Sequence, residues 1–148
     1  MALASATKVA IRAALACSSA AKEVLGLLGQ LSGGIGSVVL TVGAEAADAI
    51  PLTIQVKDEW GNNVTAVHEL TLSLLTSAAG VDFTANTYTV AATTGKLATV
   101  VTNKLFRVLT DATGLAVVTV TNAGVVTCFA GVGLPNGQRT ISATITHA

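Results

Sequence analysis

Few residues in this chain have the side chains that enzymes use for catalysis. It contains two histidines and two cysteines among 148 residues. A Ser-His-Asp hydrolase needs a histidine as its base. His147 is the penultimate residue, where we expect the chain end to fray, and His68 precedes a predicted strand, where we expect a solvated edge position. We therefore predict no catalytic residue and no enzymatic activity.

Three carboxylates, Asp58, Glu59 and Asp111, could gather at one end of a folded domain and hold calcium. Aspartate at a turn more commonly hydrogen-bonds its own backbone, so we predict this structural role and no metal site. The glycine-containing run GVGLPNG (131–137) has no strand-to-helix context and no Lys-Ser/Thr pair. It therefore does not predict a phosphate site, and we expect no cofactor.

The cysteines, Cys17 and Cys128, lie far apart in segments of different kind. A single pair of this sort does not indicate a disulfide framework. We predict that both are reduced and that Cys128 packs as a small buried apolar side chain.

The composition indicates a chain that associates with other proteins. Only 11% of residues are charged, compared with about 25% in a typical soluble domain. Eight basic residues balance eight acidic ones, so no electrostatic footprint for nucleic acid is present. Uncharged surfaces tend to associate, and we predict that much of this surface is covered in an assembly.

The first 36 residues predict an N-terminal α-helical arm. They are rich in alanine, leucine and lysine, which favour helix, although one helix or two remains open. Val24, Leu27, Leu28 and Leu31 have the i, i+3, i+4, i+7 spacing of one apolar stripe. The stripe has no basic polar face for a membrane surface, so we predict that it binds a partner subunit. SGGIG (32–36) is interpreted as a flexible joint.

After residue 36 the apolar residues no longer recur with the period of a helix. They recur at every second position, which predicts strands. Turn signals recur every 8–12 residues, the pattern of an all-β sandwich. We predict a domain over 37–148 with seven to nine antiparallel strands. In the last of them Ile141, Ala143 and Ile145 should share one face. The expected strands are 37–42, 51–57, 69–75, 83–92, 97–101, 104–110, 115–121, 125–132 and 139–147.

Three turns have distinctive chemistry. In DEWGNN (58–63), Gly61 and Asn62 are both able to take positive φ. DATG (111–114) separates two predicted strands, and Asn136-Gly137 is a strong hairpin signal. Trp60, beside Gly61, is interpreted either as an anchor for a partner or as a cover for the edge of the core.

Two of these turns carry a family resemblance. VKDEWGNNVTAVHELTLSL (56–74) and LTDATGLAVVTVT (109–121) resemble the immunoglobulin-like domains of bacterial invasin- and intimin-type proteins and of many phage virion proteins. The matching positions are Asp58, Gly61, Asn62, Thr110, Asp111 and Gly114. The resemblance implies an immunoglobulin-like sandwich over about 37–148. The closing segment GVGLPNGQRTISATITHA also looks like the final hairpin of small phage structural proteins.

The resemblance implies a phage virion structural protein assembled in the host cytoplasm. Capsid decoration or cementing is our first expectation, and a tail or head-to-tail adaptor is the second. The expected partners are capsid or tail subunits and sister copies, not nucleic acid or membrane. The alternative is a bacterial surface or adhesion module that binds a receptor or carbohydrate. The N-terminal segment lacks the uninterrupted apolar core of an export signal, which favours the first class.

Overall fold

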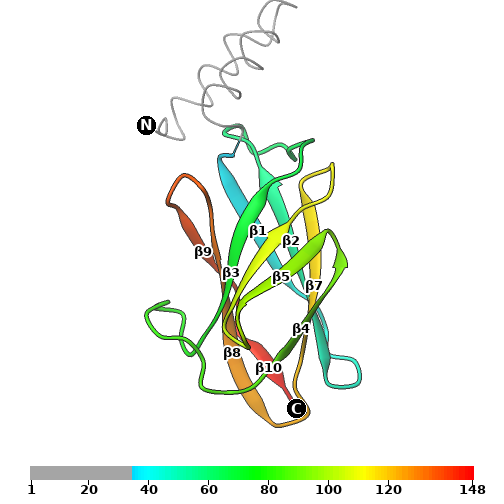
Figure 1. Ribbon diagram of the computed structural model, residues 1–148, viewed down its shortest axis with the longest axis vertical. Coiled ribbons are helices and arrows are strands. Elements are labelled where there is room, and N and C mark those ends of the chain that lie inside the picture. Colours follow the sequence, from blue (N-terminus) through cyan, green and yellow to red (C-terminus); the bar gives the residue numbers. More distant parts are fainter. Residues whose placement is uncertain (1–34) are drawn as a thin grey trace, which may run out of the picture.

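The structure is a computed structural model that describes residues 35–148 (Figure 1). Its strands are β1 (Ser37–Val42), β2 (Ala49–Lys57), β3 (Glu69–Leu75), β4 (Thr89–Thr94), β5 (Lys96–Val101), β6 (Leu105–Leu109), β7 (Leu115–Thr121), β8 (Val126–Gly133), β9 (Arg139–Ile141) and β10 (Ile145–His147). No residue in 35–148 is helical. The predicted helical arm lies outside the described residues.

The strands form two antiparallel sheets, an arrangement consistent with a β-sandwich. Sheet 1 has the order β1-β2-β7-β4. Sheet 2 has the order β10-β8-β3-β6-β5, and β9 also pairs with β8. Every pairing is antiparallel. The predicted all-β class is therefore confirmed for the described part of the chain.

Alternating side chains build the core between the sheets. In β2 the even-numbered residues Ile50 to Val56 are buried and the odd-numbered ones are only partly buried, and β7 repeats this pattern. The inward leucines of β3 and the inward residues of β6 and β8 complete the core, with Phe106 and Cys128 among them. Cys128 is buried and free, as predicted.

The sandwich begins before β1. Ile35 is 6% exposed and belongs to the core. The Gly36 N–H donates to Lys57 O at 2.8 Å, and a Cβ on Gly36 would lie 2.4 Å from Asp58 O. The last two residues of the expected joint at 32–36 are therefore packed parts of the folded body.

The predicted strand over 83–92 is wrong in its first half. Phe83 forms only an isolated bridge with Leu75, and β4 begins at Thr89. Residues 76–88 form a long connection between β3, in sheet 2, and β4, in sheet 1. The alternation of apolar and polar residues in 83–92 therefore did not distinguish a strand from a loop that runs beside a sheet.

The predicted strand over 139–147 is two strands, so residues 35–148 contain ten strands and the predicted seven to nine is too few. Gly131 pairs with Ile141 and Cys128 with Ile145, so three residues, 142–144, oppose two on β8, as in a β-bulge. The Ser142 hydroxyl accepts a hydrogen bond from the Ala130 N–H at 2.9 Å. As a result Ser142 is buried and Ala143 is exposed, and the predicted shared face of Ile141, Ala143 and Ile145 is wrong.

The end of the chain is packed, which corrects the prediction that His147 frays. His147, in β10, pairs with Val126 of β8 and is 0% exposed.

The turn predictions are largely confirmed, because Gly61, Gly114 and Gly137 have φ values of 82°, 70° and 83°. Asn62 is not among the residues with positive φ.

Candidate functional site

The predicted partner-binding residues fall into two groups. Val24, Leu27, Leu28 and Leu31 lie outside the described residues. Trp60 lies in the turn after β2 and is partly buried. Its backbone N–H donates to Asp58 Oδ1 at 2.8 Å, and its indole Nε1 is shielded from solvent.

Asp58 organises the turn that holds Trp60. Its Oδ1 also accepts from the Asn62 N–H at 2.8 Å, and its Oδ2 accepts from Asn62 Nδ2 at 3.1 Å. Gly36 packs against the Asp58–Glu59 peptide. The turn is therefore fixed beside the point where the chain enters the sandwich.

Asp111 organises the corner between β6 and β7 in the same way. Its Oδ1 accepts from Thr113 Oγ1 at 2.7 Å, from the Thr113 N–H at 2.8 Å and from the Leu115 N–H at 3.0 Å. The Thr113 hydroxyl and these amides lower the pKa of Asp111. The carboxylate is thus engaged by its own turn, which is the structural role predicted for it.

Thr110 and Gly114, which flank Asp111 in the matched positions, hold the loop that precedes β3. Thr110 Oγ1 accepts from the His68 N–H at 2.8 Å. Gly114 lies so close to Val64 O that a Cβ would approach it to 2.7 Å. His68 is partly buried rather than solvated, which corrects its expected position, and burial lowers its pKa. Within residues 35–148 no group of three His, Cys, Asp or Glu side chains could hold a metal ion.

The outer surface of sheet 1, which we call the sheet-1 face, is almost uncharged. Its members are the side chains on the side of the four strands that faces away from the core. The only charged member is Lys57, at the end of β2, and its Nζ donates to Asn63 Oδ1. The face comprises Ser37, Val39, Thr41, Ala49, Pro51, Thr53, Gln55, Lys57, Thr89, Ala91, Thr93, Leu115, Val117, Thr119 and Thr121.

The outer surface of sheet 2, the sheet-2 face, carries charges. Lys96, Leu109 and Glu69 form one row across β5, β6 and β3. Arg107, in the next row, pairs with Glu69 at an Nε–Oε1 distance of 3.2 Å, and both side chains are more than half exposed. Ion pairs of this kind contribute little to stability.

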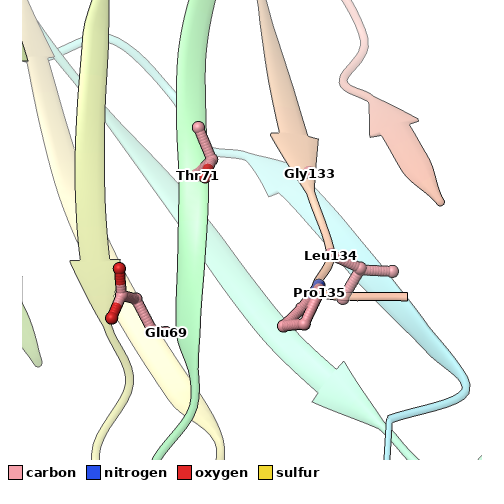
Figure 2. Close-up of a pocket in the computed structure, with 5 residues that line it drawn as sticks. All are labelled: Glu69, Thr71, Gly133, Leu134 and Pro135. Carbon is pink, nitrogen blue, oxygen red and sulfur yellow. The ribbon is translucent and has the colours of Figure 1, made fainter. Parts of the chain in front are cut away.

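A shallow hollow of about 350 Å³ lies on the sheet-2 face. Figure 2 shows its lining residues, Glu69, Thr71, Gly133, Leu134 and Pro135. Thr71 pairs with Gly133 across β3 and β8, and the glycine has no side chain to fill the space. The hollow has one carboxylate and no converging polar set, so it presents little for a ligand to bind.

Arg139 covers the other glycine of this face. Its guanidinium lies over Gly131, where a Cβ would meet Nε and Nη2 at 2.8 Å. Nη1 donates to Gly80 O at 2.6 Å, and Nη2 donates to Ser73 Oγ at 2.8 Å. This arginine therefore ties the loop after β3 to the sheet, and Ser73 and Leu75 beneath it are buried.

A buried polar cluster that local sequence patterns do not predict lies near the C-terminus. The Tyr88 and His147 ring centroids are 5.8 Å apart. His147 Nδ1 lies 3.5 Å from Glu45 Oε1, while Glu45 Oε2 accepts from the Ala148 N–H at 3.0 Å. Burial, and then the neighbouring Cys128 thiol, raise the pKa of Tyr88 to about 12. Burial also raises the pKa of Cys128, which keeps the sulfur as an unreactive thiol.

Comparison of the chain with protein-family models, with curated protein sequences and with solved structures gave no match. Among residues 35–148, no helix has the length and apolar character needed to cross a membrane.

Proposed function

We propose that this chain is a structural protein of a phage virion, with capsid decoration or cementing as its first placement and a tail or head-to-tail adaptor as its second. The two-sheet body is the displayed or cementing module, and the apolar stripe in the first 36 residues is the docking element. The partners are capsid or tail subunits and sister copies, assembled in the host cytoplasm.

One observation carries the docking part of this proposal. Gly36 packs against the peptide that follows Asp58, and Trp60 lies in that same turn. Only three residues separate Leu31, the last residue of the predicted stripe, from the buried Ile35. The segment that carries the predicted stripe therefore joins the body at the end where Trp60 lies, as expected for a module that attaches by one end and presents the other.

We also propose that the body is immunoglobulin-like. Such domains place strands A, B, E and D in one sheet and G, F and C in the other. The order β1-β2-β7-β4 fits the first set, and β9 and β10 beside β8 and β3 fit the second. One departure is that β5 and β6, which extend sheet 2 beyond β3, follow β4 in the chain. In variable-type domains the additional strands come between C and D.

The docking proposal is tested with charge substitutions in the stripe. A chain carrying Leu27→Asp and Leu28→Asp should fail to enter purified virions while its sheets stay folded by circular dichroism. A matched control, Leu25→Asp with Gln30→Asp, places the same charges off the stripe and should enter normally. Equal incorporation of the two variants would show that the stripe is not the docking element.

A separate measurement distinguishes the two function classes. Detecting a processed N-terminus by intact mass would favour the surface or adhesion module over the virion protein.

A further inference from the structure

We propose that the sheet-1 face binds a second copy of this chain, packed face to face about a two-fold axis. The inference concerns the folded body alone and does not depend on the virion role or on the N-terminal arm. The face spans all four strands of sheet 1. The central strands β2 and β7 are paired on both sides, and the backbone hydrogen bonds lie within the sheet rather than on its face. Its side chains must therefore supply the contact.

The near absence of charge on the sheet-1 face favours a second copy of this chain as its partner. Lys57 is the only charged member of the sheet-1 face, and it lies at the end of β2 with Asn63 as its partner. A partner with charged groups would have to bury them without counter-charges, which is costly. A second copy brings the same uncharged threonine, valine and alanine side chains, so the face is complementary to itself, as a two-fold interface requires.

The apolar members are placed where such an interface would cover them. Val39 is 48% exposed on β1. It lies in one cross-strand row with Gln55 and Leu115. The next row joins Thr53 to Val117 at the middle of the two central strands. Val117 thus lies near the centre of the face, Val39 and Leu115 lie one row from Lys57, and the lysine is at the margin. An apolar centre with charge at the margin is the usual arrangement of a protein interface.

The dimensions of the face suit a stable dimer. Four strands about 4.8 Å apart, with six to nine residues at about 3.4 Å each, give a footprint on the order of 450 Å². Side-chain relief increases the accessible area above this footprint. A standard specific interface buries about 800 Å² of each partner, so one copy of the face is close to the size required.

The sheet-2 face does not offer the same contact. It carries Lys96, Glu69, Arg107 and Arg139 on neighbouring strands. The loop tied down by Arg139 also covers part of it. This face therefore provides matched control positions on the same molecule.

The first test measures association of the full chain by sedimentation equilibrium. Leu27→Asp and Leu28→Asp are present throughout, so that the arm does not contribute. Thr53→Lys places a charge at the centre of the sheet-1 face, and Thr71→Lys places it on a central strand of the sheet-2 face. We expect Thr53→Lys to raise the dimer dissociation constant by about 100-fold or more, and Thr71→Lys to change it less than about 3-fold. A monomeric parent chain at about 100 μM, or equal effects of the two substitutions, would overturn the proposal.

The second test does not depend on how well the lysine variants fold. In a Cys17→Ser background, Thr53→Cys lies near the proposed two-fold axis and should form a disulfide-linked dimer on mild oxidation. Thr71→Cys, on the other face, should not. Cross-linking of both or of neither would contradict a two-fold contact through the sheet-1 face.

Discussion

The two outer faces of this molecule arise from the same alternating pattern and differ in nearly every other respect. The sheet-1 face has one charged side chain, at its margin. The sheet-2 face has several charged side chains, an exposed ion pair and a loop held down by Arg139. Both faces lie on strands whose inward residues share one core.

This difference shows what the apolar period does and does not determine. The period of two decides which side chains enter the core. It does not decide whether the outward ones meet water, a loop or another molecule. On sheet 2 the outward positions Ser73 and Leu75 are buried although they alternate with the core positions. Their cover comes from a loop and from an arginine 66 residues away in the chain from Ser73.

The largest effect on stability is expected where the chain joins the body. A fragment of residues 35–148 should melt cooperatively with a β-type circular dichroism spectrum and still associate through the sheet-1 face. Residues 37–148 lack the buried Ile35, and their free energy of unfolding should be lower by about 2–5 kcal/mol. Urea denaturation of the two fragments measures the difference. Equal stabilities would mean that Ile35 is not part of the core.

The next effect separates the two arginines of the sheet-2 face. Arg139→Ala removes hydrogen bonds to Gly80 O and to the buried Ser73 Oγ. We expect it to lower the free energy of unfolding by about 2–3 kcal/mol. Arg107→Ala breaks only an exposed ion pair, and we expect less than about 1 kcal/mol. The same urea experiment ranks them, and a larger effect for Arg107→Ala would contradict the proposed role of Arg139.

A third effect comes from the core between the faces, at alkaline pH. Burial raises the pKa of Tyr88 to about 12, compared with about 10 when unfolded. The unfolded chain therefore loses this proton first, and stability should fall as pH rises from about 10 to about 12. Tyr88→Phe should lessen that fall without changing dimerisation. Melting temperatures at pH 9 and 11 test this, and identical slopes for both proteins would show that Tyr88 ionises freely in the fold.

The smallest effect concerns the corner that connects the two sheets. Hydrogen bonds from Thr113 and Leu115 lower the pKa of Asp111. The resulting stabilisation is present above the ordinary carboxyl pKa near 3.9 and is lost as pH falls through the depressed value. Wild type should therefore lose melting temperature more steeply than Asp111→Asn below about pH 4. Parallel acid melting curves would mean that the turn does not favour the charged form.

Much of the fold could be predicted from local patterns. The alternation in 69–75 and 115–121 gave the exact bounds of β3 and β7. Turn chemistry at Asp58, Asp111 and Gly137 predicted where the chain reverses. These features depend on residues close together in the sequence, so they are readable without knowledge of the fold.

The predictions were wrong where contacts between residues far apart in the sequence determine the structure. Alternation continues through 139–147, but the Ser142 hydroxyl replaces a backbone acceptor for Ala130 and shifts the register by one residue. His147 is buried because Tyr88 and Glu45, from other parts of the chain, surround it. The sheet-1 face was likewise not predictable as a unit, because strand order brings together four segments that span residues 37–121.

The proposed dimer requires that the sheet-1 face, and not the sheet-2 face, contacts a second copy. Hydroxyl-radical footprinting of the full chain at low and high concentration tests this requirement by following modification of exposed and partly buried apolar side chains. We expect protection at high concentration of Val39, Leu115 and Val117, with Val100 and Leu109 on the sheet-2 side unchanged. Equal protection of both sets, or protection of the sheet-2 residues alone, would contradict a dimer through the sheet-1 face.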